Sequence, residues 1–161
     1  MTRFLCALLL IVAAPACADI FTAPCTKYRV PAPLARAIAR VESAGNPYAV
    51  NVAGRSYQAR NREEALRIIT NARKKGLSHD VGLMQVNSRW LRKYGVNPAV
   101  ALDPECNVWL GVWILACEIH RHGLNWTAVG AYHSPNPRRR AGYAYTVWRN
   151  YVSEVRRDGG K

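Results

Sequence analysis

The chain has 161 residues, a length that fits one domain. Half of its residues are hydrophobic, which argues against an intrinsically disordered protein. The chain has 23 Lys and Arg residues against 10 Asp and Glu residues, and its formal net charge is +13. This excess favours a polyanionic neighbour such as nucleic acid, an anionic membrane surface or an acidic cell-wall polymer, without choosing among them.

The N-terminus has the layout of a secretory signal peptide. Arg3 is followed by an apolar run over residues 4–14 and then by small residues. The run is too short to span a bilayer comfortably, and charged residues or His interrupt each later apolar run. We therefore expect residues 1–18 to be a signal peptide and residues 19–161 to form one exported domain without a transmembrane segment. A lipoprotein anchored through Cys17 is the less favoured alternative.

Three cysteines remain after the expected signal peptide, and an oxidising compartment allows two of them to form a bridge. Cys117 lies in an apolar helical stretch, which favours a buried, unpaired thiol. Cys25 and Cys106 both have loop-like surroundings, so we expect a disulfide bond between them. Such a bond stabilises a fold by about 2–4 kcal/mol because it restricts the unfolded chain.

The hydrophobic pattern of the exported domain predicts mostly helices. In chain order, the expected helices cover residues 33–44, 61–76, 88–95, 108–122, 125–134 and 142–157. Residues 48–59 favour a small hairpin, because β-type residues flank a Gly. Residues 77–80 are expected to form a loop and residues 96–107 a turn-rich connection. The helix over residues 108–122 is apolar nearly all round, which indicates a buried central position. The expected fold class is mainly α with at most a small β-hairpin.

One carboxylate does not fit its surroundings. Glu42 lies at the edge of the apolar face of the helix over residues 33–44, close to the C-terminal end of this helix. The helix dipole and an apolar neighbourhood both disfavour the charged form, so the pKa of Glu42 should be raised. A carboxylic acid with a raised pKa is suited to general-acid catalysis near neutral pH. Judged by position alone, however, a Glu42 that reaches solvent or pairs with an Arg is the favoured interpretation.

Several motifs occur in an order that strengthens the catalytic interpretation. They are RAIARVESAGNPYAV at residues 36–50, DVGLMQVNSRWL at 80–91, LDPECNVWLGVWIL at 102–115, AVGAYHS at 128–134 and GYAYTV at 142–147. Together they resemble the motifs of the soluble, goose-lysozyme-like lytic transglycosylases, and they cover nearly the whole exported domain. The insertion at residues 56–82 resembles that of the small, specialised enzymes of type IV secretion and conjugation systems.

The resemblance implies a lysozyme-like α-helical domain that acts on peptidoglycan. The implied reaction cleaves the β-1,4 bond between N-acetylmuramic acid and N-acetylglucosamine and leaves a 1,6-anhydro ring. Glu42 would protonate the departing oxygen and then, as a base, accept the proton of the muramoyl C6 hydroxyl, while the 2-acetamido group of the substrate stabilises the charge at C1. No second acid lies near Glu42 in the matched motifs, and Asp80 is expected to be a loop or cap residue. No cofactor is implied.

The resemblance also implies how the segment DVGLMQVN would shape a sugar groove. Gln85 and Asn87 would lie on its wall, because amides suit the hydroxyl and acetamido groups of sugars. Gly82 and Met84 would shape its floor, with Gln85 close to the catalytic acid. A buried amide that bonds to the backbone remains an open alternative for Asn87.

Three further residues match positions that the family places at the site. Ser43 would hold Glu42 by a hydrogen bond, or it is only a neighbour of the helix C-cap. Tyr132 and Tyr143 match motif tyrosines that lie at the carboxylate and at the sugar, and core packing is their alternative. His133 stands where the family usually has Asn, so no role is assigned to it.

Two other functions remain open from the sequence. One is a lysozyme-type hydrolase on the same fold, with water in place of the C6 hydroxyl. The other is a basic, exported, non-catalytic module that binds the wall or DNA through the clusters NPRRRAG and ARKK. His120 and His122 do not share one helix face, so no metal site is expected. The sequence predicts a periplasmic monomer that binds peptidoglycan glycan strands, with secretion or conjugation subunits as further partners and no nucleic acid.

Overall fold

A computed structural model describes residues 19–160, so the predicted signal peptide and Cys17 lie outside the described range. The helices are α1 (Thr22–Tyr28), α2 (Ala32–Ser43), α3 (Arg62–Lys74), α4 (Ser88–Lys93), α5 (Pro98–Ala101), α6 (Pro104–His122), α7 (Trp126–His133) and α8 (Pro137–Gly159). The strands are β1 (Ala49–Val52), β2 (Arg55–Gln58), β3 (His79–Val81) and β4 (Val86–Asn87). The predicted mainly α, lysozyme-like fold is confirmed. Within the described range, no helix combines the length and apolar character that crossing a membrane requires.

All the helices expected from the sequence are present, and two more lie where loops were expected. α1 and α5 are short, and a proline lies in the first turns of both. Proline suits the first turn of a helix because the missing N–H has no partner there.

The C-terminal end of α2 positions Glu42 in the last turn of the helix. Pro33 lies in the first turn of α2, where its missing N–H leaves no partner unsatisfied. The helix ends after Ser43 because Ala44 adopts a left-handed conformation, with φ at 54°, and donates its N–H to the carbonyl of Arg40. The chain then turns away toward the sheet and leaves the side chain of Glu42 at the edge of the helix.

An ion-pair network fixes α2 against α8. Glu154 of α8 is almost fully buried, and its carboxylate lies 3.4 Å from Nε of Arg36 and 3.3 Å from Nη2 of Arg40. Both arginines belong to α2 and lie one turn apart. Removing one partner of a buried ion pair is strongly destabilising, because an uncompensated charge is left behind. The network therefore holds the helix that carries Glu42 in a fixed place.

The sheet is larger than the predicted hairpin. β1 pairs with β2 as expected, but it also pairs with β3, which in turn pairs with β4, and all three pairs are antiparallel. Residues 79–81 thus form a strand where a loop was expected. Three residues are too few to show the alternation that reveals a strand. Val81 is buried in this sheet opposite Val50 and Val86.

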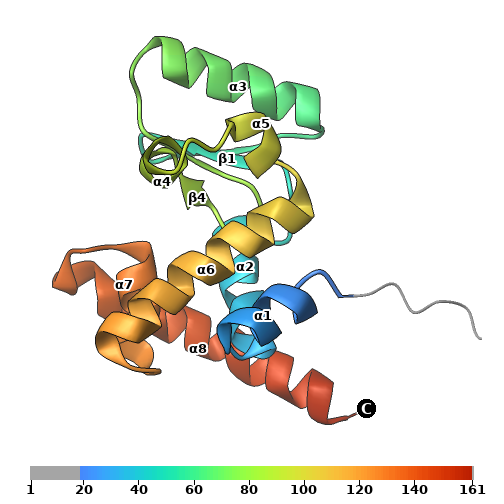
Figure 1. The fold of residues 1–161 in the computed structure, drawn as a ribbon, viewed down its shortest axis with the longest axis vertical. Coiled ribbons are helices and arrows are strands. Elements are labelled where there is room, and N and C mark those ends of the chain that lie inside the picture. Colours follow the sequence, from blue (N-terminus) through green and yellow to red (C-terminus); the bar gives the residue numbers. More distant parts are fainter. Residues whose placement is uncertain (1–18, 161) are drawn as a thin grey trace, which may run out of the picture.

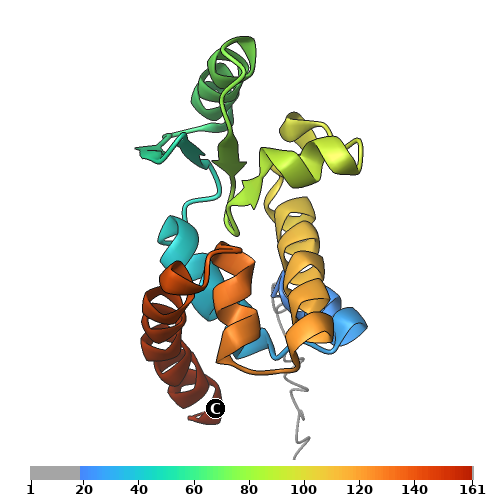
Figure 2. The same cartoon turned by 90° about the vertical axis from the view of Figure 1, so that its left-hand side faces the viewer.

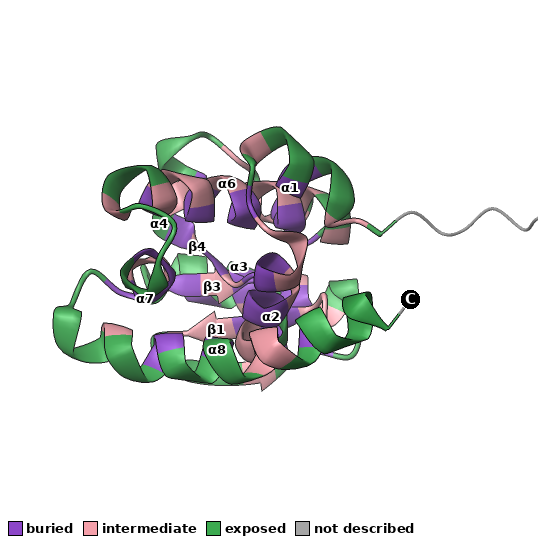
Figure 3. Cartoon of the chain, turned by 90° about the horizontal axis from the view of Figure 1, so that it is seen from below, coloured by how far each residue is buried: buried purple, intermediate pink, exposed green. Residues whose placement is uncertain are grey.

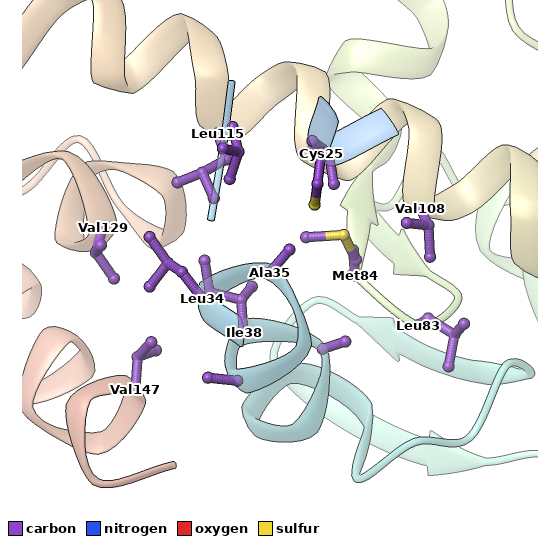
Figure 4. Packing of buried hydrophobic residues seen from close by; sticks show 14 of the residues in the cluster. Cys25, Leu34, Ala35, Ile38, Leu83, Met84, Val108, Leu115, Val129 and Val147 are labelled. Atoms are coloured by element: carbon purple, nitrogen blue, oxygen red, sulfur yellow. The ribbon is translucent and has the colours of Figure 1, made fainter. Parts of the chain in front are cut away.

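Two hydrophobic clusters divide the domain into two lobes (Figures 1 and 2). The helical lobe packs α1, α2, α7 and α8 against α6, and the sheet lobe packs the strands against α3, α4 and α5. α6 contributes to both clusters, and Figure 3 shows the buried residues of α2 enclosed between α6 and α8. The segment between β3 and β4 joins the lobes: Val81 and Val86 belong to the sheet cluster, whereas Met84 packs beside Ala35 and Val108 in the helical one (Figure 4).

The predicted disulfide bond between Cys25 and Cys106 is wrong, because both residues and Cys117 are free thiols within the described range. Cys25 belongs to α1 rather than to a loop, and it points into the helical cluster (Figure 4). Burial raises the pKa of its thiol to about 11, which makes it a small, inert hydrophobe. Cys106 lies in the first turn of α6. Cys117 is half-buried rather than buried.

Candidate active site

The side chain of Glu42 projects into a cleft between the two lobes. The cleft has a volume of about 1150 Å³, and residues of both lobes line it. Glu42 comes from the helical lobe, whereas Asp80, Gln85 and Asn87 come from the sheet lobe. Only 14% of the Glu42 side chain is exposed. The carboxyl group therefore borders the cleft while most of the side chain is buried in the protein.

Tyr143 of α8 donates a hydrogen bond from its hydroxyl to Oε1 of Glu42, at 2.6 Å. The predicted place of this tyrosine at the carboxylate is thus found in the structure, although the two residues are 101 positions apart in the chain. Burial raises the pKa of the Tyr143 hydroxyl well above its ordinary value, and the charge of Glu42 adds to this. The hydroxyl therefore stays protonated and acts as a donor to the carboxyl group.

The pKa of Glu42 is raised to about 7, as the sequence predicted. Burial is the main cause, because an apolar environment disfavours the charged form. The hydrogen bond from Tyr143 lowers the pKa, and the negative charge of Asp80 raises it. A carboxyl group with a pKa near 7 can both donate and accept a proton near neutral pH.

The loop between β3 and β4 is held by an asparagine that the sequence analysis missed. Asn107, fully buried in the first turn of α6, donates to the carbonyls of Val81 and Ala101 and accepts from the N–H of Met84 at 2.8 Å. Gly82 has φ of +78°, and a Cβ there would lie 2.3 Å from Nδ2 of Asn107. The signal in the sequence is an Asn that directly precedes the apolar run expected as a helix over residues 108–122.

Gly82 and Met84 do not line the cleft, so their predicted place at its floor is corrected. Both are buried, and Met84 packs in the helical cluster beneath the loop. Tyr132 of α7, which does line the cleft, donates its hydroxyl to the Met84 carbonyl at 2.6 Å. Gly82 and Met84 therefore set the path of the backbone rather than the surface that faces a ligand.

Gln85 lines the cleft, as predicted, and its amide also holds the loop. The residue adopts φ of 45°, an uncommon value for a residue other than glycine. Its Nε2 donates to the carbonyls of Ala49 and Gly82, at 3.0 and 2.9 Å. The hydrogen bonds offset the strain of this conformation, and the side chain is fixed at the cleft wall beside β1.

Asn87 also lines the cleft; it is half-buried, and its amide bonds to two side chains as well as to the backbone. Its Nδ2 donates to Oδ1 of Asp80 at 2.6 Å and to the Ser78 hydroxyl at 3.2 Å. Its Oδ1 accepts from the N–H of Arg89 and thereby caps α4. The amide thus joins β3, β4 and α4, with its side chain at the cleft wall.

The predicted hydrogen bond between Ser43 and Glu42 is absent from the structure. Ser43 is 1% exposed, and its hydroxyl donates to the carbonyl of Ala39 and accepts from the N–H of Gly45. Both contacts belong to the end of α2. Ser43 is therefore a helix-end residue, which was the alternative to a role in the site.

His133 is a site residue to which the sequence analysis gave no role. Its Nδ1 lies 4.0 Å from Oε1 of Glu42, and its ring stacks on that of Tyr143 with centroids 4.4 Å apart. Burial lowers the pKa of His133, the charge of Asp80 opposes this, and Arg139 adds to it. The imidazole is therefore mostly neutral near pH 7 and covers the hydrogen bond between Tyr143 and Glu42.

Asp80 is a second acid in the cleft, so its expected place in a loop or cap is corrected. It belongs to β3, opposite Asn51 of β1, and it lines the same cleft as Glu42. Burial raises its pKa, while the hydrogen bond from Asn87 lowers it. Among residues 19–160, no group of three or more His, Cys, Asp or Glu side chains is placed to hold a metal ion.

Comparison with known proteins places these residues in a family context. The model of the transglycosylase SLT domain matches residues 19–149. The invasion protein IagB of Salmonella typhi is 40% identical over 82 residues, which are 46% of this chain and 51% of IagB. The X polypeptide of Escherichia coli is 37% identical over 81 residues, 44% of this chain and 48% of that protein. The chain thus spans about half the length of these two relatives.

Another relative matches over nearly its full length. Protein IpgF of Shigella sonnei is 29% identical over 160 residues, which are 94% of this chain and 91% of IpgF. The similarity therefore includes both lobes and the cleft between them.

Proposed function

The chain belongs to the transglycosylase SLT domain family, and on this basis we propose that it is a peptidoglycan lytic transglycosylase. It cleaves the β-1,4 bond between N-acetylmuramic acid and N-acetylglucosamine and forms 1,6-anhydromuramoyl products. The observation that carries this proposal is the state of Glu42, a mostly buried carboxyl group with a pKa of about 7 that reaches a large cleft.

In the first step, neutral Glu42 protonates the glycosidic oxygen, the bond from C1 of N-acetylmuramic acid to this oxygen breaks, and the oxygen departs as the 4-hydroxyl of N-acetylglucosamine. Oε1 of Glu42 already accepts a hydrogen bond from Tyr143, so Oε2 is the oxygen left to carry the proton. The positive charge that develops at C1 is stabilised by the 2-acetamido group of the substrate, which serves in place of a second carboxylate.

In the second step, the same residue acts as a base. The carboxylate of Glu42 accepts the proton of the muramoyl C6 hydroxyl while the C6 oxygen bonds to C1, which closes the anhydro ring and regenerates the neutral acid. The Tyr143 hydroxyl stabilises the charged form between the two steps. No water is consumed, and each proton given in the first step returns in the second.

A lysozyme-type hydrolase is the second candidate, and Asp80 is the observation that favours it. Most glycoside hydrolases use a pair of carboxylate residues in one cleft. Asp80 lies in the same cleft as Glu42, and its charge acts on the pKa of Glu42. Asp80 would then stabilise the charge at C1 or orient an attacking water.

Mass spectrometry of muropeptides released from purified peptidoglycan tests the two candidates, with Glu42→Gln as the control. Products lighter by one water than the reducing sugars support the transglycosylase, and reducing-end products support the hydrolase. Release of equal amounts by Glu42→Gln would exclude a mechanism based on Glu42. Binding without release would leave only a basic wall-binding module.

The site of action is proposed to be the periplasm, after export directed by residues 1–18. One relative is named an invasion protein, and local opening of the wall for a secretion or conjugation apparatus suits a small enzyme with peptidoglycan as its substrate. Deletion of the gene should reduce secretion or transfer. Unchanged secretion and transfer, with no sister enzyme in the cell, would contradict this role.

A further inference from the structure

The cleft around Glu42 holds positive charge that the proposed reaction does not use. Three acidic side chains line it, namely Glu42, Asp80 and Glu118. The cationic side chains that line it are Arg89, Arg92 and Lys93 of α4, Arg121 of α6, and Arg139 and Arg140 of α8. Figure 2 shows that α4 and the start of α8 belong to different lobes, so the cations lie on both sides of the cleft.

Two of these six cations already have partners in the protein. Arg121 pairs with Glu118 at 2.9 Å, and Arg140 donates to the carbonyls of Ser134 and Pro135. Within residues 19–160, the other four side chains form no ion pair. Three of the four belong to α4, and we call Arg89, Arg92 and Lys93 the α4 cations.

The α4 cations are arranged at a cost to the helix that carries them. Arg92 and Lys93 lie three and four positions after Arg89, so each neighbours Arg89 on the surface of a helix of six residues. Like charges at this spacing destabilise a helix, and no acid on α4 compensates them. All three are exposed. A binding partner with negative charge would relieve this repulsion.

Aromatic rings, rather than acids, hold two of the α4 cations at the cleft. Nζ of Lys93 lies 5.3 Å from the ring centre of Trp90 and 5.1 Å from that of Tyr94, and Cζ of Arg89 lies 5.9 Å from the Trp90 ring. Trp90 itself lines the cleft. A cation on an aromatic face keeps its full charge and its hydrogen-bond donors, so these side chains are positioned yet available to an anion.

We propose that the α4 cations bind the carboxylates of the peptide stems, so that the enzyme prefers peptide-bearing glycan to bare glycan. This inference rests on the proposed function. The glycan backbone consists of N-acetylated sugars, and the lactyl carboxylate of muramic acid is consumed in the amide bond to the stem. Free carboxylates of the substrate therefore lie on the peptides, which project from the sugar chain. The α4 cations line the same cleft as Glu42, so a stem that projects from a glycan strand in this cleft can bring its carboxylates to them.

Three forms of one peptidoglycan preparation test this preference. The first is intact, the second has its stem carboxylates converted to amides, and the third has its peptides removed by an amidase. The wild-type protein is compared with the double variant Arg89→Gln/Arg92→Gln. The matched control is Lys74→Gln/Lys75→Gln, which loses the same charge from exposed side chains at the end of α3, outside the cleft lining. Initial rates of release are measured for each protein, and its binding is measured by co-sedimentation of each form with the same protein made inactive by Glu42→Gln.

The wild type should cleave and bind the intact form about tenfold better than the other two, as expected for a few exposed charge pairs. This advantage should vanish in Arg89→Gln/Arg92→Gln, persist in the Lys74 and Lys75 control, and weaken with added salt. Equal cleavage and binding of all three forms by the wild type would overturn the inference while leaving the proposed function intact. An Arg89→Gln/Arg92→Gln variant whose cleavage and binding fall equally on all three forms would also overturn the inference. Preferential sedimentation without release of any product would retain the binding site and remove the catalytic function.

Discussion

The two lobes that border the cleft use their polar side chains in different ways. In the helical lobe, Glu42, Tyr143 and His133 direct their functional groups toward one another at the cleft, and burial sets the pKa of the carboxyl group. In the sheet lobe, Gln85 and Asn87 give their amide hydrogens to the protein itself. Under the proposed function, the helical lobe would supply the reactive groups, and the sheet lobe would supply the shape of the cleft wall.

This comparison predicts that the largest loss of activity follows a change in the helical lobe. Glu42→Gln keeps the size of the side chain but removes the proton that the reaction needs. General acid–base catalysis contributes about a hundredfold to ten-thousandfold, so release of muropeptides should fall by about a thousandfold. The melting temperature at pH 8 should be equal to or higher than that of the wild type, because a mostly buried charge is removed. Appreciable residual cleavage would refute a mechanism with one acid.

The sheet lobe should respond chiefly in stability. In Gly82→Ala, the new Cβ meets Nδ2 of Asn107 at 2.3 Å in a backbone with φ of +78°. The free energy of unfolding should fall by about 3 kcal/mol, measured by chemical denaturation. Gly76→Ala is the matched control, because φ is +65° and nothing lies within 4 Å of its Cβ. The free energy of unfolding of Gly76→Ala should fall by about 1 kcal/mol. Equal losses in both variants would show that contact with Asn107 is unimportant.

Tyr143→Phe separates the acid from its hydrogen-bond donor. The Tyr143 hydroxyl stabilises the charged carboxylate and thereby lowers the pKa of Glu42, whereas burial raises it. Its removal should raise this pKa above 7, so the loss of activity with rising pH should move to higher pH. The rate should fall about tenfold, as expected for a hydrogen bond to a charged group. Tyr132→Phe is the control, because that hydroxyl bonds to the Met84 carbonyl and should leave the pH profile in place.

Asp80→Asn should have the smallest effect if the substrate's own acetamido group serves at C1. Asp80 raises the pKa of Glu42 by its negative charge, so its removal should move the loss of activity to lower pH. The rate should change by about fivefold or less, because solvent in the cleft screens the charge of Asp80. A far larger loss would identify Asp80 as a second catalytic carboxylate and favour the hydrolase. The pH profiles of both proteins on one peptidoglycan preparation make this comparison.

Local features of the sequence predicted the parts of the fold that depend on neighbouring residues. The amphipathic pattern identified the helix of Glu42. The helix expected over residues 61–76 is found as α3, which Asn61 caps by accepting from the N–H of Glu64. The raised pKa of Glu42 also followed from position, although burial rather than the helix dipole is its main cause.

Contacts between distant segments could not be predicted from local patterns. Nothing near Asp80 shows that a strand of three residues brings it to the cleft, and nothing near Asn107 shows that it fixes the loop at Gly82. The place of Tyr143 beside Glu42 was expected through the family resemblance alone. The bridge between Cys25 and Cys106 failed for a similar reason, because their burial and helical setting depend on how α1 packs in the core.

The central claim is that the Glu42 carboxylate regains its proton from the C6 hydroxyl of the substrate rather than from water. Cleavage of purified peptidoglycan in water enriched in heavy oxygen, followed by mass spectrometry, tests it directly. The account predicts products that are lighter by one water and carry no heavy oxygen, and their absence with Glu42→Gln. Reducing-end products with heavy oxygen at C1 would contradict the account and favour a hydrolase that uses Glu42 and Asp80.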